Sequence, residues 1–120
     1  MDIWNLKKIT TDAPKDNQGL GRKFSPTDLL ASSLASCMLT IIAIAKRTHS
    51  LAIDSMDADV SKKMSSTLPR KVSEIIVSIS IKGNLDDKSK LIIERSANNC
   101  PVHHSLSSDI NINLSFKYSK

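Results

Sequence analysis

An uncharged apolar stretch in the first half of the chain constrains the fold more than any other feature. Residues 29–45 read LLASSLASCMLTIIAIA and are followed by Lys46 and Arg47. A helix without a polar face is usually buried on all sides. The stretch is shorter than the roughly 20 residues needed to cross a bilayer and contains several hydroxyl side chains, so we expect no membrane span. The sequence therefore predicts a helix in the middle of a soluble hydrophobic core.

The start of this helix has its own signature. Ser25 can cap the helix, Pro26 fits the first helical position, and Asp28 stands where the acid of a capping box reaches back. Before it, the polar run Thr11–Gly21 predicts a loop. A short apolar piece around Ile3–Ile9 is a candidate strand ahead of the loop. We therefore expect the helix to begin directly after Ser25.

Alternating apolar residues dominate the second half of the chain. Strands are predicted around residues 56–60, over 72–82 and over 110–118, where apolar and polar side chains alternate. Residues 86–98 predict a helix with acids in its first turn. The order helix, strand, strand, helix, strand indicates an α+β fold with mostly antiparallel pairing.

The length of the chain makes the apolar helix difficult to bury. A chain of 120 residues is one domain's worth, so we expect a single domain over residues 1–120. Three or four strands and one short helix cannot wrap an all-apolar helix in so small a domain. A symmetric homodimer in which two such helices share one core removes the difficulty. We therefore expect an obligate dimer.

The charge and the N-terminal sequence bear on partners and compartment. The formal net charge is +5, and the basic excess is scattered over residues 61–120 without interleaved aromatic side chains. This pattern is typical of a solvated surface and does not favour nucleic-acid binding. The start MDIWNLKKITTDAP has no apolar signal-peptide core. We expect a cytoplasmic protein.

Two cysteines are the candidate functional residues. Cys37 lies in the apolar stretch, and Cys100 precedes Pro101 after the second predicted helix. Buried, inert thiols are one interpretation, because free cysteine behaves as a small hydrophobic residue. Redox chemistry is the other, and it requires a thiolate with a cation nearby. Arg22, Arg70 and the histidines are the candidates, and their spacing does not choose among them.

Two further interpretations of Cys100 are weaker. The run Cys-Pro-Val-His-His offers metal ligands, but a closed zinc site needs four ligands and only Cys37 and His49 remain to complete it. We therefore expect no metal and no bound cofactor. A Cys–His hydrolase dyad is also conceivable, but no nucleophile elbow or oxyanion-hole loop accompanies it.

The two cysteine segments together resemble a known family. The stretch FSPTDLLASSLASCM (Phe24–Met38), followed by CPVHHSL (Cys100–Leu106), resembles the OsmC/Ohr family of osmotically inducible and organic-hydroperoxide-resistance proteins. The resemblance extends from about Thr11 to Phe116. It implies an intertwined homodimer in which antiparallel sheets from both protomers wrap two central helices.

The resemblance also implies a chemistry. Family enzymes are thiol-dependent peroxidases, and by position Cys37 matches the peroxidatic cysteine and Cys100 the resolving one. The substrate would be an organic hydroperoxide, and the reductant an external dithiol such as the lipoyl groups used in the better-known branch. The implied role is oxidative-stress defence.

The sequence departs from the peroxidase branch in two places. Thr27 stands where that branch has a glutamate, and we expect the adjacent Asp28 to cap the helix instead. We expect the N-terminal strand region that carries the branch's activating arginine to be shortened, and Arg22 does not match that arginine by motif. The chain thus resembles the OsmC-like side branch more closely. A non-catalytic protein of the same fold that binds a small hydrophobic ligand is the alternative.

Overall fold

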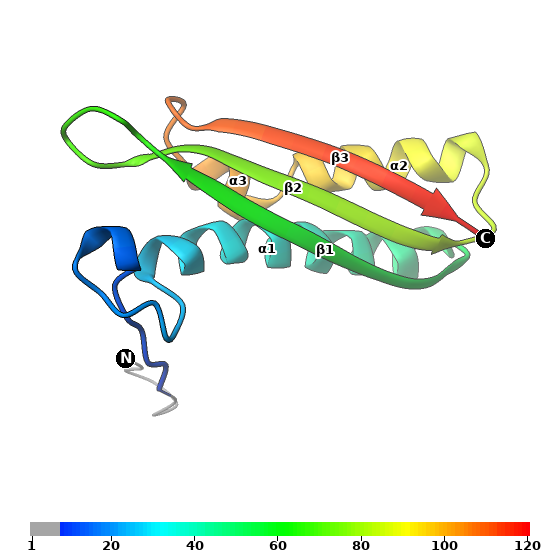
Figure 1. Cartoon of the computed structure of the whole chain (residues 1–120). Helices are drawn as coiled ribbons and strands as arrows, with labels where there is room; N and C mark the ends of the chain where they lie inside the picture. The colour runs from blue at the N-terminus through cyan, green and yellow to red at the C-terminus, as the bar shows by residue number, and fades with distance from the viewer. Residues whose placement is uncertain (1–7) are drawn as a thin grey trace. The chain divides into compact units, whose positions relative to one another are not determined.

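The computed structural model of the chain describes residues 8–120 (Figure 1). The chain divides between Leu30 and Ala31 into two compact units. The first contains a short 3₁₀ helix, η1 (Lys15–Asn17), inside the loop predicted at Thr11–Gly21. The candidate strand at Ile3–Ile9 falls almost entirely outside the described residues.

The long helix α1 (Pro26–His49) begins where the sequence predicts. The backbone N–H of Ser25 donates to Asp28 Oδ2 at 3.0 Å, and the N–H of Asp28 donates to Ser25 Oγ at 3.1 Å. These reciprocal bonds form a capping box and satisfy donors that a helix start leaves unpaired. The capping role expected for Asp28 is confirmed. The helix runs beyond the apolar stretch, and Lys46, Arg47 and His49 lie in its last turn, where cations are favourable.

The second unit holds a three-stranded sheet in the order β1-β2-β3. The strands are β1 (Ile53–Met64), β2 (Val72–Gly83) and β3 (Asn111–Ser119), as the alternation predicts. β1 and β2 are antiparallel, whereas β2 and β3 are parallel. The expectation of antiparallel pairing is therefore wrong for β3. The reason is the intervening helical segment, which carries the chain back along the sheet as parallel neighbours require.

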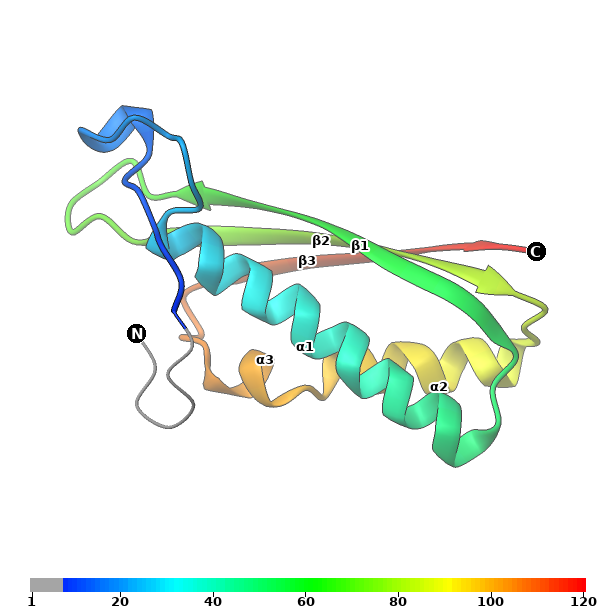
Figure 2. The same ribbon diagram turned by 90° about the horizontal axis from the view of Figure 1, so that it is seen from below.

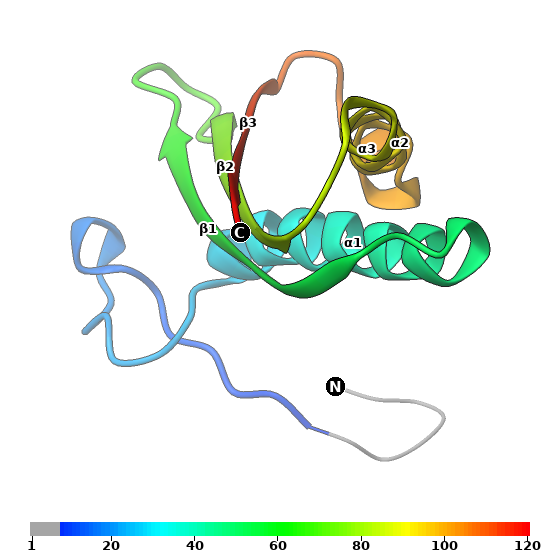
Figure 3. The ribbon, with the colours of Figure 1, turned by 90° about the vertical axis from the view of Figure 1, so that its right-hand side faces the viewer.

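Two helices make this connection, α2 (Asp87–Asn98) and α3 (Pro101–Ser105). Figures 2 and 3 show α2 and the body of α1 on the same side of the sheet. The pairing register places Val60, Val77 and Leu114 in one row across the three strands. Because side chains alternate across a strand, the apolar residues in step with this row point to the helical side, whereas Ile76 lies on the opposite face.

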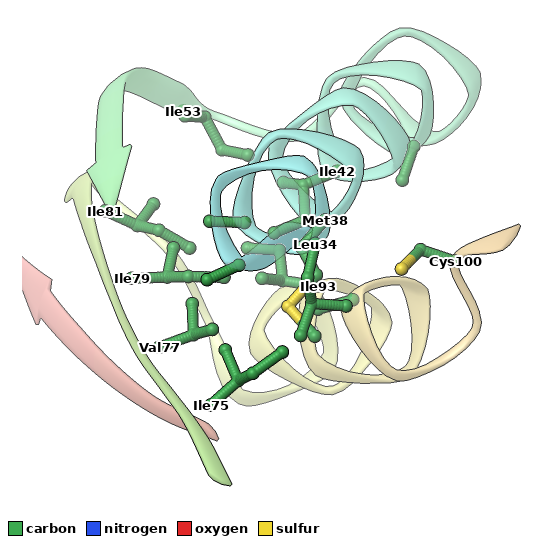
Figure 4. Packing of buried hydrophobic residues seen from close by; sticks show 14 of the residues in the cluster. Leu34, Met38, Ile42, Ile53, Ile75, Val77, Ile79, Ile81, Ile93 and Cys100 are labelled. Atoms are coloured by element: carbon green, nitrogen blue, oxygen red, sulfur yellow. The ribbon is translucent and has the colours of Figure 1, made fainter. Parts of the chain in front are cut away.

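The core of the second unit lies between the sheet and the helices (Figure 4). Leu34, Met38 and Ile42 of α1 are completely buried against it. The other core side chains with at most 1% exposure come from β2, from α2 and from the turn after α2: Ile75, Val77, Ile79, Ile81, Ile93, Ala97 and Cys100. The aliphatic core follows from a composition with only 3% aromatic residues.

In the single chain, α1 buries only one side. Ser33, Ser36 and Thr40 are exposed, and Ile44 is 44% exposed. The expectation of burial on all sides is thus not met within one protomer. By length and hydropathy α1 also passes the criterion for a membrane span, a test that the core helix of a soluble protein passes as well. Six of its residues pack in the core just described.

Tyr118 ties β3 to α2 and gives a testable contribution to stability. Its hydroxyl donates to Glu94 Oε2 at 2.8 Å, and Lys90 Nζ lies 5.0 Å from the ring centroid. We expect Tyr118→Phe to lower the free energy of unfolding by about 1–2 kcal/mol, because the bond to a carboxylate is lost. Urea unfolding at neutral pH measures this loss.

The stability that Tyr118→Phe removes should depend on pH. Burial, followed by the hydrogen bond and the charge of Glu94, raises the pKa of Tyr118 above its ordinary value of 10.0. A raised pKa means that the folded state favours the protonated phenol, so this contribution is present below pH 10 and declines above it. The difference between wild type and Tyr118→Phe should therefore shrink at alkaline pH. A difference that grows with pH would contradict this assignment.

Candidate functional site

Cys37 lies near the middle of α1, at the border between its buried and exposed sides. Cys37 shares one face of the helix with Ser33, Ile41 and Ile44, which are partly or largely exposed. The next residue, Met38, is completely buried. The helical repeat of 3.6 residues explains this position, since residues four apart share a face. Cys37 is a free thiol of intermediate exposure. The helix thus presents this sulfur at the edge of the core.

Cys100 lies at the turn between α2 and α3 and is completely buried. Its Sγ accepts a hydrogen bond from the backbone N–H of His103 at 3.3 Å and so caps α3. Pro101 occupies the first helical position, where its missing N–H costs nothing. Figure 4 shows the Cys100 sulfur directed from this turn toward the core. The sequence around Cys100 therefore positions the thiol by local helix capping.

The structure brings the two cysteines together although 62 residues separate them in the chain. Burial raises the pKa of the Cys100 thiol, and the Cys37 side chain raises it further by hydrogen bonding and by charge. The backbone N–H groups of His103 and Val102 act in the opposite direction. Such an effect requires the Cys37 and Cys100 side chains to be neighbours. Both cysteines are free thiols in the structure.

The two histidines after Cys100 have different surroundings. His104 is exposed, and its Nε2 lies 2.7 Å from Asn99 Oδ1. His103 is half-buried, and its Nδ1 is enclosed with no hydrogen-bond partner among the described residues. The rings stack with centroids 6.1 Å apart. The sequence placed the histidines among several candidate cations and metal ligands without singling out His103; its place three residues after Cys100 was the available signal.

Two of the candidate cations, Arg22 and Arg70, lie in loops outside α1. Arg22 lies in the first unit, where its backbone N–H donates to Asp12 Oδ2 at 3.2 Å and its Nε lies 3.9 Å from the same oxygen. Arg70 lies in the exposed loop between β1 and β2. Across residues 8–120, no three His, Cys, Asp or Glu side chains gather into a group able to hold a metal.

An open cavity of about 590 Å³ lies in the first unit. Its lining contains no cysteine and no histidine, so neither Cys37 nor Cys100 takes part in it. The lining residues are Thr10, Gly21, Arg22, Lys23, Phe24 and Asp28.

Comparison with protein families decides the relationship. Residues 18–115 match the family described as OsmC-like protein. The chain belongs to this OsmC-like family. The matched range contains both Cys37 and Cys100, and the resemblance seen in the sequence is confirmed. No match was found among curated proteins.

Solved structures show the same fold. A Psychrobacter arcticus protein, provisionally described as induced by osmotic stress and active in a detoxification response, is 49% identical, with a TM-score of 0.81 over 88% of this chain and 77% of that one. An organic hydroperoxide resistance protein OsmC from Legionella pneumophila is 17% identical, with a TM-score of 0.79 over 93% and 82% of the two chains. One from Elizabethkingia anophelis, solved with thiocyanate bound, is 15% identical, with a TM-score of 0.75 over 88% and 77%.

Two of these structures are named organic hydroperoxide resistance proteins, and they share the fold of this chain. The α+β architecture expected from the sequence is confirmed, with α1 and α2 packed on a three-stranded sheet. The catalytic roles of Cys37 and Cys100 remain predictions.

Proposed function

We propose that this OsmC-like protein reduces organic hydroperoxides through Cys37 and Cys100 in oxidative-stress defence. The observation that carries the proposal is the juxtaposition of two free thiols, one on α1 and one at the α2–α3 turn. Cys37 has the exposure that attack on an external substrate needs, whereas Cys100 is enclosed. The difference in exposure supports the assignment of Cys37 as the attacking thiol and Cys100 as the resolving thiol.

The reaction balances with these two residues and an external dithiol. The Cys37 thiolate attacks the terminal oxygen of the hydroperoxide, the O–O bond breaks, and the alkoxide leaves and takes a proton to become the alcohol. Cys37 is then a sulfenic acid. The Cys100 sulfur attacks the Cys37 sulfur, the S–O bond breaks, and water leaves as the disulfide forms. A dithiol then reduces the disulfide by thiol exchange and returns both thiols.

The surroundings of the thiols support an organic substrate. Val102 and Leu106 near Cys100 are half-buried and pack against the hydrophobic core, as does Ile41 on the helix of Cys37. Apolar surface beside a reactive thiol favours a substrate with an alkyl or aryl tail, because each buried methylene contributes about 0.8 kcal/mol. Cumene hydroperoxide is therefore a better substrate in this account than hydrogen peroxide.

The proposal includes an assembly and a setting. The active form is a homodimer in which the exposed side of α1, with Ile44, is covered by a second copy. The reductant is a dithiol, for which a lipoylated protein is the leading candidate, and the compartment is the cytoplasm. No metal, bound cofactor or nucleic acid takes part in this proposal.

A turnover assay tests this function directly. With dihydrolipoamide as reductant, the protein should consume cumene hydroperoxide at least about 10-fold faster than hydrogen peroxide, a ratio that corresponds to about 1.4 kcal/mol of tail burial. Glutathione, a monothiol, serves as the control reductant and should support slower turnover. Consumption no faster than in buffer with dihydrolipoamide alone would contradict the proposal.

One observation favours a second candidate function, the binding of a small hydrophobic ligand without catalysis. Cys100 is completely buried and its pKa is raised, which are properties of an inert structural thiol. The apolar interface of the dimer would then hold the ligand. Cysteines that stay reduced in excess hydroperoxide, together with saturable binding of an apolar fluorophore, would favour this function.

A further inference from the structure

His103 is half-buried and follows the buried thiol of Cys100 by three residues. His103 occupies the third position of α3, and its main chain already contacts Cys100 Sγ through the N–H bond of 3.3 Å. A side chain at this position can reach back over the capping residue, as the acid of a capping box does. The His103 backbone is therefore fixed at the turn that holds Cys100, and its ring can reach back from there.

The His103 ring has one enclosed nitrogen and one accessible side. Nδ1 is buried and has no hydrogen-bond partner among the described residues, and the ring as a whole is only half-buried. Burying a polar nitrogen without a partner costs free energy, so such a group invites a functional explanation. An imidazole with one nitrogen in the interior and an edge at the surface is suited to move a proton between the two.

Cys100 needs such a group if it resolves a sulfenic acid, an inference that rests on the proposed function. Burial raises the pKa of the Cys100 thiol, so it is protonated at neutral pH. The side chain of Cys37 on α1 raises this pKa further, whereas the backbone N–H groups of His103 and Val102 lower it. The other titratable group at this turn is His104, whose ring stacks on His103 and bonds Asn99.

We propose that His103 accepts the proton of the Cys100 thiol in the resolving step. The Cys100 S–H bond breaks, the proton passes to His103 Nδ1, and the sulfur attacks Cys37. The hydroxide that leaves Cys37 takes a proton from the imidazolium and becomes water, so His103 ends unchanged. Because Nδ1 bonds no protein atom in the reduced state, a rotation of the thiol or one bridging water completes the path.

A mixed-disulfide assay isolates this step from the peroxide reaction. Ellman's reagent converts the more exposed Cys37 to a mixed disulfide and releases one thionitrobenzoate; attack by Cys100 then releases a second. In a Cys100→Ser variant only the first release should occur. We expect His103→Asn to slow the second release by about 10-fold to 10²-fold near neutral pH, the lower part of the range for loss of a general base. His104→Asn, the matched control, should leave it within about 2-fold of wild type.

Two further readouts separate proton transfer from a structural role. The rate of the second release in His103→Asn should approach the wild-type rate as the pH rises toward the pKa of Cys100, because solvent then removes the proton. Added imidazole should accelerate the second release in His103→Ala. An unchanged second release in His103→Asn, or a defect that neither pH nor imidazole relieves, would overturn the inference.

The same assay keeps this inference distinct from the proposed function, because it uses no hydroperoxide. In one outcome, the second release is normal and depends on His103, but cumene hydroperoxide does not oxidise Cys37. This outcome would refute the peroxidase function alone. Oxidation of Cys37 by hydroperoxide with a second release that does not depend on His103 would refute the role of His103 alone.

Discussion

Replacement of Cys37 by serine should abolish hydroperoxide reduction, with a fall of at least about 10³-fold to the rate of the uncatalysed reaction. A serine hydroxyl is not ionised at neutral pH and cannot form a sulfenic acid. The substitution changes one half-exposed atom on α1, so the fold should persist. Cumene hydroperoxide consumption with dihydrolipoamide measures the effect, and thermal unfolding verifies the fold.

Cys100→Ser is the matched comparison for this prediction. It keeps the attacking thiol and removes the resolving one, so the first equivalent of hydroperoxide should be consumed and further turnover should stop or depend on direct attack by the reductant. A sulfenic-acid probe such as dimedone should then label Cys37. Equal activity in wild type and Cys37→Ser would show that the thiol on α1 is not the reacting group.

A charge on the exposed side of α1 should separate the proposed dimer into monomers. Ile44 is 44% exposed in the single chain and lies two helical turns beyond Cys37 on the same face. In Ile44→Asp a carboxylate would be buried without a partner in the interface, a cost of several kcal/mol, which corresponds to a dissociation constant raised by about 10³-fold or more. Analytical ultracentrifugation at micromolar concentration should show the change.

Leu91→Asp is the control for the interface prediction. Leu91 is also a large exposed aliphatic residue, 49% exposed, but it lies on α2 and not on α1. We expect this variant to remain dimeric. A wild-type protein that sediments as a monomer at micromolar concentration would contradict the dimer, and dissociation by both variants would show that the effect is not specific to α1.

The sequence predicted those parts of the fold that depend on local patterns. The start of α1 was predictable from Ser25, Pro26 and Asp28, because helix capping depends on residues within one turn. The alternation of Ile75, Val77 and Ile79 carries β2 and the face that it buries. Each of these signals lies inside a short window, so the sequence alone is sufficient.

Long-range arrangements were beyond the sequence. The alternation through Leu114 and Phe116 is the same for either strand direction, so the parallel pairing of β3 follows only from the path of α2 and α3. The approach of Cys37 to Cys100 likewise depends on how α2 packs on α1, which no local spacing expresses. The enclosure of His103 Nδ1 is a third such feature. The sequence was thus sufficient to identify the candidate residues but not to predict that they lie close together.

The central claim is that Cys37 and Cys100 form one redox pair. Intact-mass measurement and peptide mapping of the reduced wild-type protein after one equivalent of cumene hydroperoxide test it most directly. The account predicts the loss of two hydrogen atoms and a peptide that links Cys37 to Cys100 of the same chain. Two unmodified thiols after excess hydroperoxide would contradict it.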